Sequence, residues 1–265
     1  MTRRRVRRWP MRLAVAAVVF SLAAMGGLTV VFPALAAVFC PSCYNMEHYE
    51  NGLIVEQSMS ETERMRLSRD LALARMRLIA IFGPDLRRTA VLACASRDCE
   101  RRLGGRGPVA ITHSVPGISV IRLAPEGRTP VILAHELAHA VVHGRAGVRA
   151  LMTSRLPAWF DEGLAVIASE DPRFLGAARD GERFGLSRCI GAPGEDLPVH
   201  SRDWLPFAAR NRGAPYAAAA CRVLGWMADH GGWDGVLAAV IDIRGGARPL
   251  RCGLRSARLK APGAA

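Results

Sequence analysis

The chain has 265 residues, half of them hydrophobic, which suffices for one large domain or a domain with a small lobe. Its formal net charge of +13 is concentrated at the ends, because residues 1–12 carry six arginines and residues 244–265 carry five arginines and Lys260. Without these twelve, 24 basic residues face 23 acidic ones, so the body is nearly neutral and we expect no nucleic-acid partner. Residues 244–265 are expected to form a basic disordered tail.

Residues 13–40 contain no charged residue, a run longer than the roughly 20 residues of a membrane span. The basic segment 1–12 favours a cytoplasmic N-terminus, which places the remainder across the membrane on the periplasmic side. The run is predicted to be either an uncleaved transmembrane signal anchor or a signal peptide cut after Ala34-Leu35-Ala36. Its length slightly favours the anchor, since the core of a cleaved signal is typically about 7–15 residues.

Seven cysteines would then face an oxidising compartment. Cys94 and Cys99 are close enough in sequence to bridge, whereas the pairing of Cys189, Cys221 and Cys252 stays open. Cys40-Pro41-Ser42-Cys43 is a C-x-x-C motif, which either forms a structural pair or serves as a redox dithiol. The structural pair is favoured, because the redox version usually opens a helix after a strand.

Residues 41–59 are predicted to be a linker and residues 60–243 the main folded domain. Ser60 and Glu63 form a capping box that predicts a helix over about 61–82. A strand over 89–94, a helical turn over 96–103 and a hairpin of strands 109–113 and 118–123 are expected to follow. The edge of the second hairpin strand either pairs with an extended peptide or is an ordinary edge.

The stretch from Thr129 to Gly144, TPVILAHELAHAVVHG, predicts a helix. Thr129 is a good N-cap, and Pro130 stands at the first helical position, where its missing N–H costs nothing. Gly144 is placed to end the helix with a left-handed cap.

Inside this helix lies the pattern H-E-x-x-H, formed by His135, Glu136 and His139. Residues four apart share a helical face, so both imidazoles can bind one metal ion. Glu136 lies beside that face, where a base can take a proton from a metal-activated water. The alternative is a buried helix that merely contains these residues, at the cost of ionisable groups with no obvious partner.

Further helices are predicted over about 157–169, 214–230 and 233–243, with a loop-rich region over 171–213. A zinc site needs a third ligand, and Glu162 is the strongest candidate, ahead of Asp161 and Glu170. The alternative is that Asp161 and Glu162 only favour the positive end of their helix. His113 and His200 are possible substrate-pocket groups, although exposed or capping roles are favoured for both.

On two motifs the chain resembles the gluzincins, the zinc metallopeptidases that include thermolysin and the aminopeptidase N type. The matching residues are His135-Glu136-Leu137-Ala138-His139 and Trp159-Phe160-Asp161-Glu162-Gly163-Leu164-Ala165. The resemblance implies one zinc ion on His135, His139 and Glu162, with Glu136 as general base and acid. It also implies an α+β fold: a zincin-like domain with a small, mostly antiparallel sheet and an active-site helix, then a mainly helical lobe.

The resemblance has limits that narrow the function. Tyr216 resembles the tyrosine that stabilises the oxyanion in the aminopeptidase branch, but a core or capping tyrosine is the alternative. The strand before the metal helix has no carboxylate for a substrate amine, so exopeptidase specificity does not carry over. Val166 stands where the thermolysin branch has an aspartate that orients a zinc histidine. His143 is not expected to be a third histidine ligand, because the metzincin pattern needs a glycine turn and a longer gap before that histidine.

The sequence thus predicts a zinc metallopeptidase that hydrolyses peptides or proteins, attached to the membrane through residues 13–40 or secreted to the periplasm. One alternative is a non-catalytic zinc-binding module of peptidase-like fold that binds proteins at the membrane. The other is a thiol–disulfide protein that uses Cys40 and Cys43. The intact Glu136 favours the enzyme.

Overall fold

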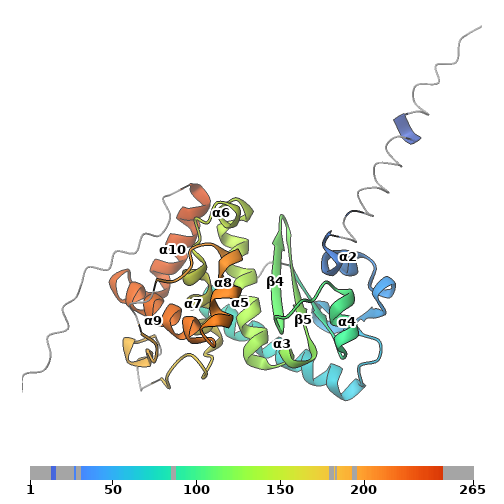
Figure 1. Cartoon of the computed structure of the whole chain (residues 1–265), viewed down its shortest axis with the longest axis horizontal. Helices are drawn as coiled ribbons and strands as arrows, with labels where there is room; N and C mark the ends of the chain where they lie inside the picture. The colour runs from blue at the N-terminus through green and yellow to red at the C-terminus, as the bar shows by residue number, and fades with distance from the viewer. Residues whose placement is uncertain are drawn as a thin grey trace, which may run out of the picture. The chain divides into compact units, whose positions relative to one another are not determined.

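The computed structural model describes residues 13–15, 27, 31–84, 88–178, 182, 184–192 and 196–246 (Figure 1). The predicted basic N-terminus, most of the uncharged run before residue 31 and the basic tail from residue 247 lie outside these residues. Within them, no helix combines the length and the apolar character that crossing a membrane requires. The chain divides into two compact units, Met1–Gly144 and Arg145–Ala265, and each is described by itself.

The N-terminal unit contains a five-stranded sheet in the order β1-β2-β3-β5-β4. Its strands are β1 (Met46–His48), β2 (Leu53–Glu56), β3 (Thr89–Ala93), β4 (Ala110–Val115) and β5 (Ile118–Leu123). β2, β3 and β5 run parallel, while β1 and β4 are antiparallel to their neighbours. The prediction of a mostly antiparallel sheet is therefore wrong: α3 (Glu61–Phe82) connects β2 to β3, and a parallel pair needs such a crossover.

Two of these strands lie where the sequence predicts a linker. Residues 41–59 fold into η1 (Pro41–Tyr44), β1, η2 (Glu50–Gly52) and β2. All four residues of β2 are buried, which shows that this segment belongs to the sheet. The helix α3 begins and ends where the sequence predicts, and Ser60 and Glu63 form the expected capping box.

The two faces of the sheet carry different helices. Directly opposed residues share a face, so Thr112 lies on the same face as Ile121, and His113 lies with Val120 on the other. On the second face, α2 (Pro33–Phe39) packs in a buried cluster with Val120. On the first face lies α5 (Pro130–Ala146), and Figure 1 shows α5 and α2 on opposite sides of β4 and β5.

β5 is an inner strand, because it pairs with both β3 and β4. The prediction that the second hairpin strand offers an edge is therefore wrong, and the edge is β4. A short helix, α4 (Arg97–Arg102), and a 3-10 turn, η3 (Pro125–Gly127), complete the connections of this unit.

The helix α5 continues past Gly144 to Ala146, so the predicted end at Gly144 is wrong. Gly144 is buried and keeps helical backbone, whereas Gly147, with φ of +81°, is the glycine whose left-handed conformation separates α5 from α6 (Val148–Met152).

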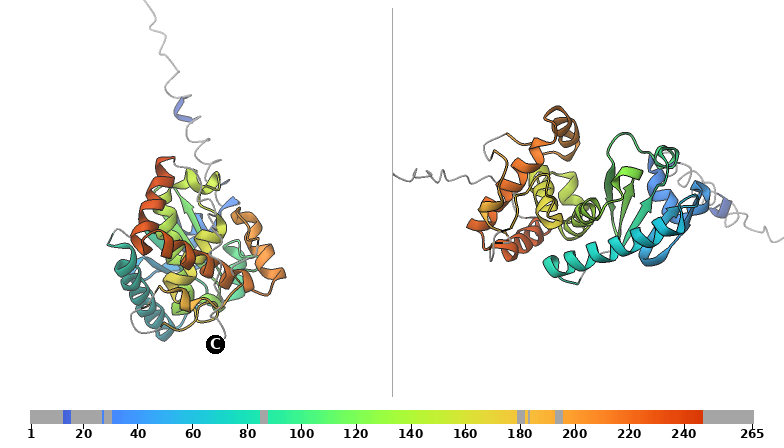
Figure 2. Two further views of the ribbon diagram at one scale, coloured as in Figure 1. Left: turned by 90° about the vertical axis from the view of Figure 1, so that its left-hand side faces the viewer. Right: turned by 90° about the horizontal axis from the view of Figure 1, so that it is seen from below.

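The C-terminal unit is helical (Figure 2). Its elements are α6, α7 (Ala158–Ser169), η4 (Leu186–Arg188), α8 (Ser201–Arg210), α9 (Ala214–Asp229) and α10 (Gly232–Gly245). α7 packs closely against α9, and a Cβ on Gly163 would lie only 2.5 Å from the carbonyl oxygen of Ala219. The glycine in the matched motif thus permits helix–helix approach. The helix α8 lies inside the region predicted to be loop-rich.

Three disulfides join the cysteines of the described residues: Cys40–Cys43, Cys94–Cys99 and Cys189–Cys221. The first two are the pairs that the sequence favours. The third connects the segment before residue 192 to α9, and Cys252 lies outside the described residues.

Candidate metal centre

The helix α5 begins as its sequence predicts. The backbone N–H of Ile132 donates to Thr129 Oγ1 over 3.3 Å, and Pro130 is the first helical residue. The cap fixes the start of the helix, and the 3.6-residue period then brings positions 135 and 139 to one face.

His135 and His139 lie with their Nε2 atoms 3.2 Å apart. Two nitrogen ligands of a tetrahedral zinc ion, each bonded at about 2.05 Å, would be separated by about 3.3 Å. The observed separation therefore fits two ligands of one ion. His139 is buried and His135 is half-buried, so the pair is shielded without being closed off from solvent.

The Glu136 carboxylate has a hydrogen-bond partner that the sequence does not predict. The hydroxyl of Thr112, on β4, donates to Glu136 Oε2 over 2.6 Å and also lies 3.0 Å from the Glu136 carbonyl oxygen. Within the described part of the chain, Glu136 Oε1 makes no hydrogen bond. Thr112 thus holds one oxygen of a buried carboxylate and leaves the other available to accept a proton.

Two groups of described residues could hold a metal ion. They are His135, His139 and Glu162, and His139, His143 and Asp161. Both groups take their carboxylate from α7, where Asp161 is buried and Glu162 is half-buried. The chain thus carries histidine and carboxylate groups that could bind a metal.

His143 is already engaged on the sheet side of α5. Its Nδ1 lies 3.1 Å from the hydroxyl of Ser114, which in turn lies 3.1 Å from the hydroxyl of Ser119. This chain of hydroxyls connects β5, β4 and α5, and it gives His143 a structural role that needs no metal.

His113, considered as a pocket group in the sequence, lies on the other face of β4. Its cross-strand partner Val120 belongs to the cluster under α2. Burial, with a smaller contribution from the charge of Arg122, lowers the pKa of His113. The neutral imidazole is therefore favoured here, away from the face that carries Glu136.

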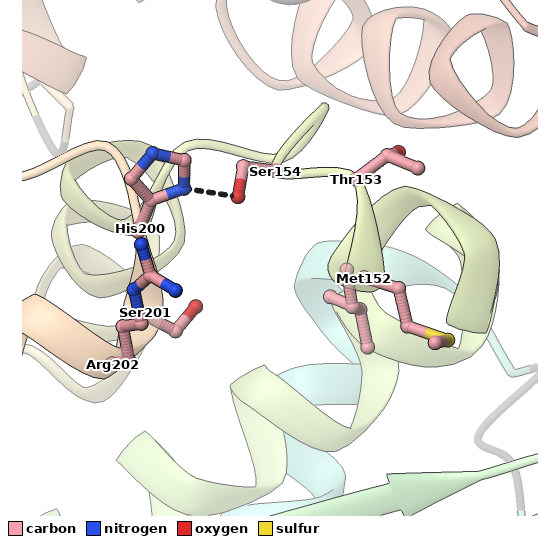
Figure 3. A pocket seen from close by; sticks show the side chains of 7 residues that line it. Met152, Thr153, Ser154, His200, Ser201 and Arg202 are labelled. Atoms are coloured by element: carbon pink, nitrogen blue, oxygen red, sulfur yellow. Dashed lines mark hydrogen bonds between the residues drawn. The ribbon is translucent and has the colours of Figure 1, made fainter.

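His200 lines a pocket of about 340 Å³ in the C-terminal unit (Figure 3). Its Nδ1 lies 2.6 Å from the hydroxyl of Ser154, a residue whose backbone has φ of +51°. Arg202, in the first turn of α8, also lines this pocket. The structure thus places His200 in a polar, open pocket at the start of α8.

Tyr216 lies in the first turn of α9. Its ring stacks on Phe174 at 5.0 Å and meets Trp204 edge-on at 5.4 Å. The two aromatic neighbours hold the ring of this half-buried tyrosine in place. A role in packing is enough to explain both contacts.

Comparison of the chain with protein-family models, with curated proteins and with solved structures found no match. The assignment of a function therefore depends on the geometry described above.

Proposed function

We propose that this chain is a zinc metallopeptidase, which hydrolyses peptide bonds with Glu136 as general base. The observation that carries the proposal is the pairing of two histidine nitrogens 3.2 Å apart with an adjacent carboxylate that has one oxygen fixed and one available. A purely structural histidine pair would not need that carboxylate to be buried beside it.

The proposed ligands are His135, His139 and Glu162, which gives two nitrogens and one carboxylate oxygen. This donor set is the one typical of a catalytic zinc site, in which a fourth position stays open. When bound there, zinc would polarise the scissile carbonyl and lower the pKa of the attacking water. One ion per chain is expected.

Glu136 then performs the proton transfers. Its Oε1 accepts a proton from the attacking water and afterwards delivers that proton to the leaving amine. The Thr112 hydroxyl holds Oε2, which keeps the carboxylate in one rotamer during both transfers. We further propose that Tyr216 stabilises the oxyanion by donating a hydrogen bond from its phenolic hydroxyl, a role that its resemblance in sequence supports.

The edge strand β4 suits a peptide substrate. Thr112 lies on it, and in the described sheet β4 pairs only with β5. The backbone groups of its other edge can pair with an extended peptide, which would bring the peptide close to Glu136.

The test compares the full chain with Glu136→Gln in hydrolysis of a peptide library, at equal zinc content. The amide keeps the size of the side chain but cannot take the proton, so hydrolysis should fall by about 10²–10⁴-fold while zinc stays bound. The matched control is Glu126→Gln, a carboxyl-to-amide change at an exposed residue of the same unit, which should leave the rate unchanged.

Two results would contradict the proposal. Equal rates for the wild type and Glu136→Gln would assign the hydrolysis to another group or to a contaminant. Zinc binding without hydrolysis by either protein would favour a non-catalytic zinc-binding module.

A further inference from the structure

The helix α2 is part of the folded core of the N-terminal unit. Ala34 and Ala37 lie in a buried cluster with residues of the sheet and of the Cys94–Cys99 disulfide, and Ala37 has no exposed surface. The loop after α4 also approaches this helix closely: a Cβ on Gly104 would lie 2.9 Å from Pro33 Cγ. Residues 33–36 therefore pack closely against the rest of the N-terminal unit.

This packing conflicts with removal of a signal peptide after Ala36. Cleavage there would take away Pro33 to Ala36, and with them the carbonyl of Ala36, which accepts from the N–H of Cys40 over 3.0 Å. It would also create a charged amino group at Ala37, whose surface is fully buried when residues 33–36 are present. Loss of this buried turn takes apolar contacts away from the core, so we expect a chain that begins at Ala37 to be less stable than one that keeps residues 33–36.

The exposed side chains around α2 suit a membrane surface. Val31, Phe32 and Phe39 are exposed, Phe39 by 72%, and the two phenylalanines are seven residues apart, on one helical face. All three belong to the run of residues 13–40 that contains no charge. The apolar face thus lies at the point where the chain would leave a bilayer.

We propose that the Ala36–Ala37 bond is retained, and that the uncharged N-terminal run holds the N-terminal unit at a lipid bilayer through α2. The helix then has two roles: its alanine face completes the core, and its phenylalanine face lies against lipid. This inference does not depend on the proposed peptidase activity.

The first experiment determines the N-terminus of the full chain, expressed in a bacterium with its normal export machinery. Mass spectrometry should find residues 31–37 in one uncleaved polypeptide, and alkaline carbonate should leave that polypeptide in the membrane fraction. Recovery of a stable, soluble protein that begins at Ala37 would overturn the proposal.

The second experiment tests the role of α2 in the core, with the full chain in detergent. Ala37→Asp places a charge at the buried position and should lower the unfolding temperature by several degrees, whereas Phe39→Asp, at the exposed position of the same helix, should change it by about one degree or less. If Ala37→Asp yields no folded protein, the milder Ala37→Ser should show the same sign. Equal unfolding temperatures for the wild type and both Ala37 variants would show that α2 is not part of the core, and would overturn the proposal.

Discussion

The two faces of the strands β4 and β5 are built from alternate residues of the same short hairpin, yet they meet the helices α5 and α2 through different kinds of contact. One face presents Thr112 and Ser114, whose hydroxyls meet Glu136 and His143 of α5. The other presents Val120 to the alanine face of α2. Polar contacts connect one helix to the sheet, and small apolar contacts connect the other.

The difference shows how residues on opposite faces of one strand can have separate roles, one in the stability of the fold and one at the candidate metal site. Because side chains alternate along a strand, a change at one residue affects one face and leaves the other nearly intact. Variants on the α5 face should therefore alter metal binding or turnover at constant stability. Variants on the α2 face should alter stability at constant metal content.

The largest effect is expected for the carboxylate that would complete the site on the α5 face. Glu162→Ala should weaken zinc binding by more than about 100-fold, because loss of a partner that only orients a ligand already costs 10–100-fold. Zinc content after dialysis against a chelator series would measure the effect. Asp161→Asn is the matched control and should keep the ion; the reverse result would assign the metal to His139, His143 and Asp161.

The next effect belongs to the α2 face. Leu92 has no exposed surface and lies in the cluster under α2, so Leu92→Ala should lower the free energy of unfolding by about 2–5 kcal/mol. Denaturant titration would measure this loss. The zinc content of the folded protein should not change, and a parallel loss of zinc would show that the two faces are coupled.

A smaller effect is expected for Thr112. Hydrogen bonds to charged groups contribute about 1.5–3 kcal/mol, so Thr112→Val should lower kcat/KM by about 10- to 100-fold. Thr112→Ser keeps the hydroxyl and should restore most of the rate. Zinc content should be equal in all three proteins, and if Ser fails to restore activity, the hydroxyl is not what positions Glu136.

The smallest effect concerns pH and His113. The pKa of His113 is lowered in the folded state, so the unfolded chain binds more protons at this residue. The contribution of His113 to the free energy of unfolding is therefore complete above its ordinary pKa near 6.5. It should be lost progressively as the pH falls below about 6.5. His113→Gln should make the unfolding free energy less dependent on pH in that range, measured on the metal-free protein. An unchanged pH dependence in His113→Gln would show that this imidazole does not contribute to it.

Local signals in the sequence predict several elements closely. The capping box at Ser60 gives both the start and the type of α3, and Thr129-Pro130 gives the start of α5. The strands β3, β4 and β5 also fall where their runs of β-branched residues predict. In these places short-range chemistry decides the structure, so the sequence alone suffices.

Elements that depend on pairing between distant residues could not be predicted from the sequence. β1 and β2 are only three and four residues long, and β2 is held by hydrogen bonds to β3, more than thirty residues later. Thr112 is likewise one of many threonines until the β4 register brings it to Glu136. Cys189 and Cys221 pair because the segment before residue 192 returns to α9, which no spacing rule indicates.

That pattern of bridges has a consequence for the order of folding. The first six cysteines bond in consecutive pairs along the chain: 40 to 43, 94 to 99 and 189 to 221. A polypeptide that enters an oxidising compartment N-terminus first, and oxidises each thiol with its nearest predecessor, therefore makes every one of these bonds correctly at the first attempt. Its maturation would not need the slow thiol–disulfide reshuffling that can take up to hours, since the sequence order of its cysteines already matches the native pairing.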